Sequence, residues 1–422
     1  MKLPAVMNGV FANESYPHFA TEFQKSINRE IVGAAMYYRA MKLFSKFSNS
    51  ELFCIADSQN CIQYCDVLLD IVWEKLNTGH WNDVADDWRY FYTFLSTVKA
   101  LCQCLKVEHS SHVDTETFYD YSEAVETCDR GLIMGAPVIE NALRNIVSAL
   151  QAYIMRNSVS REPCACHAKR AKLESADELL KLTNRITRLS CPSLEYFRTN
   201  FMDRGEPVIL TDCIDFWPAF DGDRKWCVHY LKRTCGCRIV PVEIGSKYTD
   251  ENWSQKLMSV REFIEEFVEP GRASKIAYLA QHQLFDQIPE LRRDIVVPTY
   301  CCLGDSTDED VDINAWFGPS GTVSPLHHDP KRNFLAQVVG EKFVKLFPPE
   351  QSRFLYPHDE TLLNNTSRVD VENPDFETFP LYRKTTVKEG VLRPGDMLYI
   401  PPKYWHFIKS LSVSFSVSFW WK

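Results

Sequence analysis

Apolar side chains recur at helical intervals along the first 155 residues. Within residues 27–47, 51–107 and 137–155 they return every three or four positions, as in the stripe Ile139, Leu143, Ile146, Val147 and Leu150. Glycine and proline are scarce there, and we recognise no fixed-period repeat. The pattern predicts an N-terminal helical domain over residues 1–155. It is either a packed bundle that supports the rest of the chain or a surface that binds a partner protein.

The pattern changes to that of strands in the second part of the chain. A helical stretch at 193–203 precedes short apolar runs at 207–210, 238–242, 343–347 and 397–400. Residues 411–421 alternate strictly, with Val413, Phe415, Val417 and Phe419 set between serines, and this period of two is typical of a strand. Gly395-Asp396 fits a turn between two strands. We therefore expect an α+β chain whose second domain, residues 178–422, is a rolled or closed β-structure.

Residues 156–177 separate the two patterns and predict a linker. They combine Pro163 and several serines with five basic residues, Arg156, Arg161, Lys169, Arg170 and Lys172. A solvated hinge explains these charges. Residues 167–172 could also serve as a nuclear-import signal.

The segment Ser324-Pro-Leu-His-His-Asp-Pro330 carries the strongest candidate chemistry. In a strand, His327 and Asp329 point to the same face while His328 points away. His406 follows His327 by 79 residues, a distance that fits a strand on the far side of a small barrel. Two imidazoles and one carboxylate form the facial triad of Fe(II) oxygenases, whereas a structural zinc site is usually closed by four ligands. Taken alone, the motif also fits a polar turn and an unrelated surface histidine.

Further residues could hold a dicarboxylate co-substrate beside such a metal. The far carboxylate of that molecule needs one cation and several neutral donors. Lys342 is the candidate cation, and Tyr278, Ser324 and Asn333 are candidate donors.

Taken together, these segments resemble a known family. From about residue 200 to the end, the chain is similar to the Jumonji-C (JmjC) 2-oxoglutarate oxygenases, and most similar to those that hydroxylate arginine. The resemblance rests on several motifs in order, residues 278–285, 314–319, 325–330, 333–335, 401–406 and 416–421. It implies a double-stranded β-helix, that is, a cupin-like jelly roll, behind the helical domain. His328 departs from the pattern of the nearest members, and we expect no change in chemistry because it faces away from the metal.

The resemblance also implies roles for individual residues. His327, Asp329 and His406 would bind Fe(II), and O2 would be consumed with 2-oxoglutarate. The co-substrate would be held by Tyr278, Ser324, Asn333 and Lys342, with Trp420 packed near it. Trp316 and Glu243 would shape the pocket for a substrate arginine, and a carboxylate suits a guanidinium because the pair can form two parallel hydrogen bonds. Taken alone, Glu243 also fits an ordinary exposed strand residue.

Three functions are compatible with these residues. The first is hydroxylation of arginine at carbon 3 in a protein, with 2-oxoglutarate converted to succinate and CO2. The second is demethylation of N-methyl-lysine in histones, where the oxidised methyl group leaves as formaldehyde. The third is a non-catalytic helical and cupin-like scaffold, which the intact triad and Lys342 disfavour. A zinc peptidase is disfavoured because the chain has no His-Glu-x-x-His motif.

Composition limits the classes of partner and the cell compartment that fit this chain. Hydrophobic residues make up 45% of the 422 positions, enough for a sizeable core. A net charge of −9 argues against electrostatic binding of nucleic acid over a broad surface and suits basic protein substrates. Fifteen cysteines, no secretory signal and no apolar run of membrane-spanning length favour free thiols in the nucleus or cytoplasm.

Overall fold

We describe the protein from a computed structural model covering residues 1–422. The described residues are 24–48, 55–79, 83–109, 117–137, 142–157, 182, 184–245, 253–269, 275–304, 311–359 and 363–422. The chain separates into two compact units, which are treated one at a time below. One consists of Met1–Glu162 with Cys235–Ile239, and the other of Pro163–Thr234 with Val240–Lys422. The domain boundaries at 155 and 178 stay predictions, and residues 158–177 of the predicted linker lie outside the described residues.

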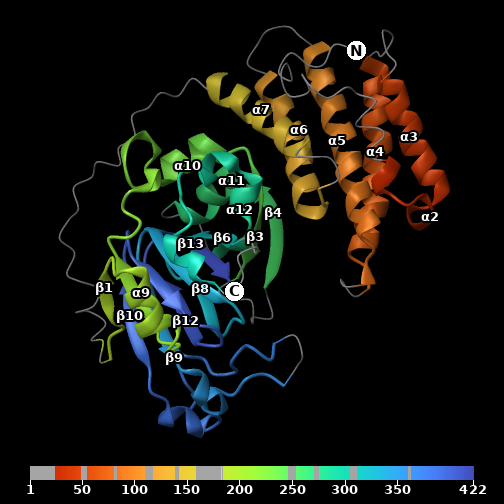
Figure 1. The fold of residues 1–422 in the computed structure, drawn as a ribbon. Coiled ribbons are helices and arrows are strands. Elements are labelled where there is room, and N and C mark those ends of the chain that lie inside the picture. The colour runs from red at the N-terminus through yellow and green to blue at the C-terminus, as the bar shows by residue number, and fades with distance from the viewer. Residues whose placement is uncertain are drawn as a thin grey trace. The chain divides into compact units, whose positions relative to one another are not determined.

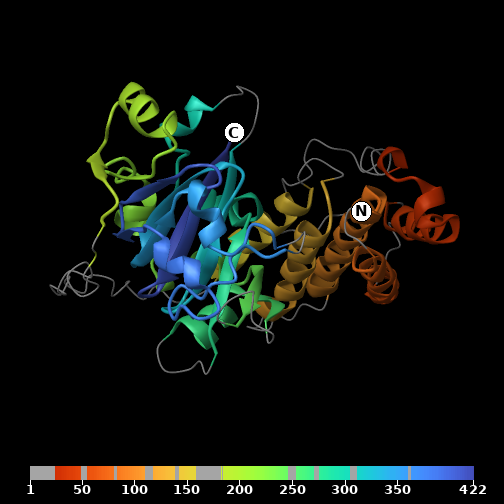
Figure 2. The ribbon, with the colours of Figure 1, turned by 90° about the horizontal axis from the view of Figure 1, so that it is seen from below.

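The first unit is helical, as the periodicity predicts. Its described helices are α2 (Arg29–Val32), α3 (Ala34–Ser48), α4 (Ile55–Leu76), α5 (Asp86–His109), α6 (Thr117–Met134) and α7 (Ala142–Asn157). The helix expected over residues 27–47 is broken at Gly33, which has a φ of +85° that suits glycine. Helices α4 to α7 lie side by side, and a single cluster of buried residues runs between them (Figures 1 and 2).

Two glycines bring α5 and α6 unusually close together. A Cβ on Gly131 would lie 2.7 Å from the Cβ of Ser96, and one on Gly135 would lie 2.0 Å from the Oγ1 of Thr93. Neither position therefore accepts a side chain without a shift of the backbone. The hydroxyl of Thr93 uses this proximity to donate to the carbonyl of Ala136 at 2.8 Å.

A fully buried ion pair lies in the same unit. Arg238, from the segment Cys235–Ile239, donates to Asp129 of α6 with Nη2 at 2.7 Å and to Gln151 of α7 with Nη1 at 2.9 Å. The backbone N–H of Ile239 donates to the other oxygen of Asp129 at 2.7 Å. Arg238 and Asp129 have no exposed side-chain surface, so each charge depends on the other.

The second unit contains two sheets. The strands are β1 (Arg188–Ser190), β2 (Val208–Thr211), β3 (Ile239–Ile244), β4 (Ser254–Ser259), β5 (Ala277–His282), β6 (Asp312–Gly318), β7 (Val323–His327), β8 (Arg332–Val339), β9 (Lys342–Phe347), β10 (Lys388–Leu392), β11 (Met397–Ile400), β12 (Trp405–Ser410) and β13 (Ser414–Trp421). The larger sheet has the order β1-β2-β11-β8-β13-β6-β5-β3-β4 and the smaller one β10-β9-β12-β7. The predicted α+β class and rolled double sheet are confirmed.

Short helices flank these sheets. They are α9 (Leu194–Phe197), α10 (Val228–Cys235), α11 (Val260–Phe263), α12 (Leu284–Gln287) and α13 (Pro289–Arg292). Between the sheets, one hydrophobic cluster combines Leu335 and Leu398 of the larger sheet with Val344 and Ile408 of the smaller one. No helix among the described residues has the length and apolarity needed to cross a membrane.

The alternating strand β13 is buried on both faces. It pairs with β6 on one side and β8 on the other, so it lies inside the larger sheet. Its serines 414, 416 and 418 have no exposed surface. They are satisfied by polar partners: Ser416 donates to Gln337 Oε1 at 2.8 Å, and Ser418 accepts from Trp316 Nε1 at 2.9 Å. The serine face of this strand is therefore turned into the protein and not toward water.

The buried ion pair predicts how the helical unit responds to substitution. Asp129→Ala should destabilise that unit by about 3–5 kcal/mol, because Arg238 would keep an uncompensated buried charge. Glu126→Ala is the matched control, since Glu126 forms an exposed i,i+4 pair with Arg130 on the same helix and such pairs contribute about 0.3–0.5 kcal/mol. Denaturant unfolding followed by circular dichroism measures both. Equal losses in the two variants would contradict this account.

Candidate metal and co-substrate site

Neighbouring strands of the smaller sheet bring the predicted metal ligands together. His327 ends β7, Asp329 follows it in the loop, and His406 lies near the start of β12. The antiparallel pairing of β12 with β7 sets His406 directly opposite His327. The expectation of a strand on the far side of a barrel is therefore wrong, because the third ligand comes from the adjacent strand.

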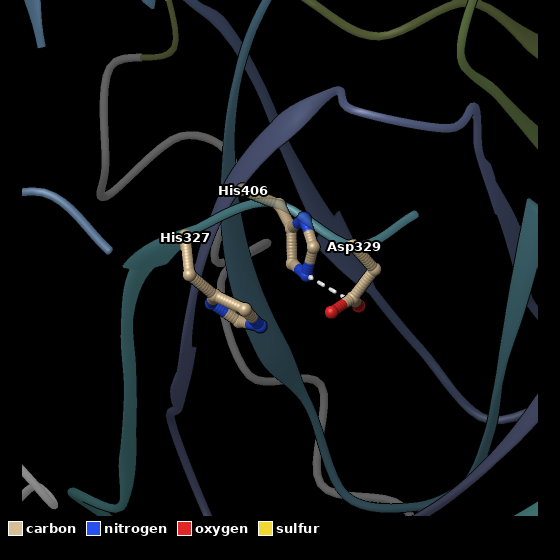
Figure 3. Close-up of side chains that lie close together, drawn as sticks. All are labelled: His327, Asp329 and His406. Carbon is tan, nitrogen blue, oxygen red and sulfur yellow. Dashed lines mark ion pairs between the residues drawn. The ribbon is translucent and has the colours of Figure 1, made fainter. Parts of the chain in front are cut away.

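The three side chains converge on one point, as Figure 3 shows. One ligand atom from each lies within 4.8 Å of the other two, and this is the one group of its kind found among the described residues. His406 Nε2 lies 3.6 Å from Asp329 Oδ2, and the two imidazole ring centres are 4.2 Å apart. The arrangement could hold a single metal ion.

Hydrogen bonds fix the tautomers of both histidines. His327 Nδ1 lies 2.7 Å from the carbonyl oxygen of Pro325, and His406 Nδ1 lies 3.0 Å from that of Tyr404. A carbonyl oxygen only accepts, so each Nδ1 carries a proton, which leaves Nε2 of each ring as the atom that can bind a metal. This backbone support is the usual outer partner of a metal-binding histidine.

The electrostatics of His406 also suit a cation. Burial, reinforced by the neighbouring His327, lowers the pKa of His406 to about 4, although Asp329 opposes the shift. His406 is therefore neutral near pH 7, and its contact with Asp329, dashed in Figure 3, is not an ion pair at that pH. A carboxylate oxygen and an unprotonated nitrogen then face each other, which is favourable only with a cation between them.

His328 takes no part in this group. Its ring packs edge-on against the Trp405 ring, with the two ring centres 4.6 Å apart, and burial lowers the pKa of His328. The alternation of side chains past the end of β7 is thus as predicted. A backbone hydrogen bond holds the loop that follows β7. The N–H of Lys403, just before β12, donates to the carbonyl of Asp329 at 2.7 Å. Lys403 itself has a left-handed φ of +61°, a conformation that costs energy in a residue other than glycine.

Lys342 at the start of β9 is a buried cation. Its side chain is 1% exposed, and burial lowers its pKa to about 7. Among the described residues its recorded hydrogen bond is to the hydroxyl oxygen of Tyr278, at 3.0 Å, and no carboxylate pairs with it. A buried ammonium without an anion is costly, so this position suits an anionic ligand.

Tyr278 and Ser324 complete a group of donors around Lys342. Tyr278 comes from β5 of the larger sheet, whereas Ser324 and Lys342 come from the smaller one, so the group lies between the sheets. Burial and the nearby Glu243 raise the pKa of Tyr278, and a hydrogen bond from Ser324 opposes the shift. Because Tyr278 stays protonated and its oxygen accepts from both neighbours, its own hydrogen remains available to a ligand.

Asn333 and Trp420 face each other in the larger sheet. They are direct partners in the pairing of β8 with β13. Asn333 Oδ1 and Trp420 Nε1 are both buried and have no hydrogen-bond partner among the described residues. Such orphaned polar atoms suit a missing ligand or water.

The two predicted substrate residues lie beside Tyr278. Glu243 on β3 is its direct partner across the sheet, and the Trp316 ring on β6 is centred 6.0 Å from the Tyr278 ring. Burial raises the pKa of Glu243, so the residue is not the solvated strand position that its short motif also allowed. Its carboxylate accepts a hydrogen bond from Trp253 Nε1 at 3.2 Å. Sequence reasoning missed Trp253, for which no motif gives a signal.

Comparison with known proteins places the chain in a family. Residues 193–422 match the model of a cupin-like domain, and residues 54–163 match that of KDM8-like N-terminal ARM repeats. The chain is 45% identical to lysine-specific demethylase 8 of Danio rerio over 379 residues, 89% of this chain and 91% of that protein. The chain belongs to the JmjC family of cupin-like oxygenases.

Two further JmjC relatives support this. Jumonji C domain-containing protein 5 of Drosophila melanogaster is 39% identical over 362 residues, covering 84% of this chain and 85% of the relative. Lysine-specific demethylase JMJ30 of Arabidopsis thaliana is 37% identical over 378 residues, covering 83% and 84%. As a JmjC protein the chain is a 2-oxoglutarate-dependent oxygenase. The ARM-repeat match corrects the expectation that the helical domain has no repeat.

The geometry predicts that metal binding depends on His406 and not on His328. His406→Ala should abolish binding of Mn(II), a redox-stable probe, because a three-ligand site has no spare ligand. His328→Ala is the control, because His328 lies next to a candidate ligand but points away from it. This variant should bind one ion per chain, as the parent does. Equilibrium dialysis with metal analysis measures both, and circular dichroism checks folding. Metal bound by folded His406→Ala, or lost from folded His328→Ala, would contradict the assignment.

Proposed function

We propose that this protein is an Fe(II)- and 2-oxoglutarate-dependent oxygenase that hydroxylates arginine side chains at carbon 3 in proteins. His327, Asp329 and His406 hold the iron in this proposal. The donor set supports it, since two imidazoles and one carboxylate within 4.8 Å suit Fe(II) and leave positions open. Iron bound there would supply the activation of O2 that is coupled to decarboxylation of 2-oxoglutarate.

The observation that carries the proposal is the buried Lys342 ammonium without a carboxylate partner. In the proposal it binds the far carboxylate of 2-oxoglutarate, while Tyr278 donates to the same group and Ser324 orients the Tyr278 hydroxyl. Asn333 and Trp420, whose buried polar atoms lack partners among the described residues, would contact the remaining polar surface of the co-substrate. In a non-catalytic scaffold, a buried ammonium without an anionic partner would cost stability with no compensating function.

Glu243 is the proposed acceptor for the substrate. Its half-buried carboxylate has one recorded hydrogen bond, from Trp253, and can still accept both N–H groups of a guanidinium edge. Trp316 would pack against the substrate side chain. The chain's net charge of −9 favours basic protein segments generally.

N-methyl-lysine demethylation is the second candidate. It is favoured by the names of two of the relatives above, which are lysine-specific demethylases. The same iron and co-substrate residues would serve it, and the demethylase would act on histones in the nucleus. The two candidates differ at Glu243, because a methylated ammonium is a point charge that cannot use a fork-shaped acceptor.

The role of Lys342 predicts a trade between stability and co-substrate binding. Lys342→Met should stabilise the ligand-free protein, by about 1–4 kcal/mol, because an apolar chain of similar length replaces a buried charge. The same variant should lose the thermal stabilisation that 2-oxoglutarate and Mn(II) give the parent together. Thermal unfolding with and without 2-oxoglutarate measures both effects. A destabilised variant that still responds to 2-oxoglutarate would make Lys342 a structural residue.

The stability gap between Lys342→Met and the parent should also depend on pH. The folded pKa of about 7 lies below the ordinary lysine value of 10.5, so the folded parent binds fewer protons than the unfolded chain between these values. The penalty in the parent is therefore full below about pH 7 and shrinks as pH rises toward 10. A gap that stays constant from pH 6.5 to 9 would contradict the buried-charge account.

The role of Glu243 predicts a separation of two activities. Glu243→Gln should lower oxidation of an arginine peptide at least tenfold while sparing the slow decarboxylation of 2-oxoglutarate without peptide, since the amide keeps the shape but loses the charged double acceptor. Glu341→Gln is a control carboxylate on the same unit. Succinate release and peptide mass are measured in one reaction. Unchanged peptide oxidation would remove Glu243 from the substrate site.

A further inference from the structure

A cavity lies within the helical unit. Its volume is about 390 Å³, and its walls come from one face each of three helices. The lining residues are Asp66, Leu69, Asp70 and Trp73 of α4, Tyr92, Ser96 and Lys99 of α5, and Thr127 and Arg130 of α6. The residues of α4 recur at positions i, i+3, i+4 and i+7, so they form a single wall.

One carboxylate in the cavity lining has no ion-pair partner among the described residues. Lys99 Nζ pairs with Asp66 at 2.6 Å, and Arg130 pairs with Glu126 at 2.8 Å. Asp70 has no recorded ion pair or hydrogen bond to another described residue. The walls carry two carboxylates and two cations and are neutral overall. Asp70 is the lining carboxylate that these two ion pairs leave without a partner among the described residues, and a cationic ligand could pair with it.

The apolar surface beside Asp70 suits a flat cation. Trp73 follows Asp70 by three residues on the same helical face, and 51% of its surface is exposed. An indole ring next to a carboxylate can hold a guanidinium, by stacking on one side and by two hydrogen bonds on the other. A compact ammonium makes less use of both surfaces.

An unsatisfied hydroxyl in the lining of the cavity is a second, independent sign of a ligand. Ser96 is 1% exposed, and its Oγ has no hydrogen-bond partner among the described residues. It packs against Gly131 of α6, where a Cβ would lie 2.7 Å from the Cβ of Ser96, so α6 closes off the space behind it. Buried hydroxyls are normally paired, and a ligand or a water held by one would satisfy this one.

We propose that this cavity binds an arginine side chain of a partner protein segment, with Asp70 as the charged acceptor and Trp73 as the stacking surface. The binding itself does not depend on the activity at the iron site. If the proposed function holds, arginine-bearing substrates would be recognised at two places, the iron site and this cavity. A substrate would then need a second arginine outside the segment that is oxidised.

Peptide binding to the full-length protein tests the proposal. The probe is a fluorescein-labelled Gly-Ser-Gly-Arg-Gly-Ser-Gly peptide, and the same peptide with citrulline is its neutral isostere. Both are titrated by fluorescence anisotropy in a Glu243→Gln background, so that the proposed acceptor at the iron site does not contribute. Asp70 and Trp73 are exposed, and their substitution should not unfold the helices.

We expect the citrulline peptide to bind about tenfold more weakly than the arginine peptide. Asp70→Asn should weaken arginine-peptide binding by a similar factor and remove the preference over citrulline, because the same contact is lost either way. Trp73→Leu should weaken it several-fold. Glu74→Gln is the matched control: it removes a charge from the next turn of α4, outside the cavity lining, and should change nothing.

Two outcomes would overturn the proposal. One is equal binding of the two peptides to the protein with Asp70 intact. The other is an unchanged arginine preference in Asp70→Asn, which would place the arginine elsewhere. Failure of the proposed function is recognised separately, because it appears as unchanged arginine-peptide oxidation in Glu243→Gln whatever happens at Asp70.

Discussion

The pairing of β12 with β7 is the constraint on which the candidate site depends. It sets His406 opposite His327, and a backbone hydrogen bond from Lys403 to Asp329 ties the loop after β7 to the turn before β12. Each imidazole is then oriented by the backbone carbonyl two residues before it in the chain. Three ligand atoms thus meet without any contribution from the larger sheet. A shift of the β12 register by one residue would turn His406 to the opposite face and separate it from His327 and Asp329.

The larger sheet supplies the other half of the site, and the buried Lys342 ammonium joins the halves. Lys342 extends from the smaller sheet to the hydroxyl of Tyr278 in the larger one. Tyr278 is in turn the cross-strand partner of Glu243. The strand pairing therefore links the proposed co-substrate anchor to the proposed substrate acceptor through one buried phenol. A buried ammonium without a carboxylate partner is the expected cost of the anion site proposed there.

The sequence could predict the candidate ligands but not how the strands bring them together. The i, i+2 spacing of His327 and Asp329 is a local property, and so is the outward turn of His328 against Trp405. The position of His406 in the adjacent strand is set by strand order, which a separation of 79 residues does not encode. Likewise, the alternation of β13 indicates a strand but not two paired neighbours that bury its serines. The segment Cys235–Ile239 joins the helical unit through Arg238, a contact over 109 positions that no local pattern shows.

The most direct test of the central claim is the fate of O2 in a reaction with two competing peptides. One peptide carries arginine and the other N-methyl-lysine, and both are incubated with the protein, Fe(II), 2-oxoglutarate and ¹⁸O2 before mass analysis. Our account predicts that the arginine peptide gains one ¹⁸O atom on the arginine side chain, with one succinate formed per event, and that Lys342→Met forms neither product. Loss of a methylene from the lysine peptide with an unchanged arginine peptide would contradict it and identify a demethylase.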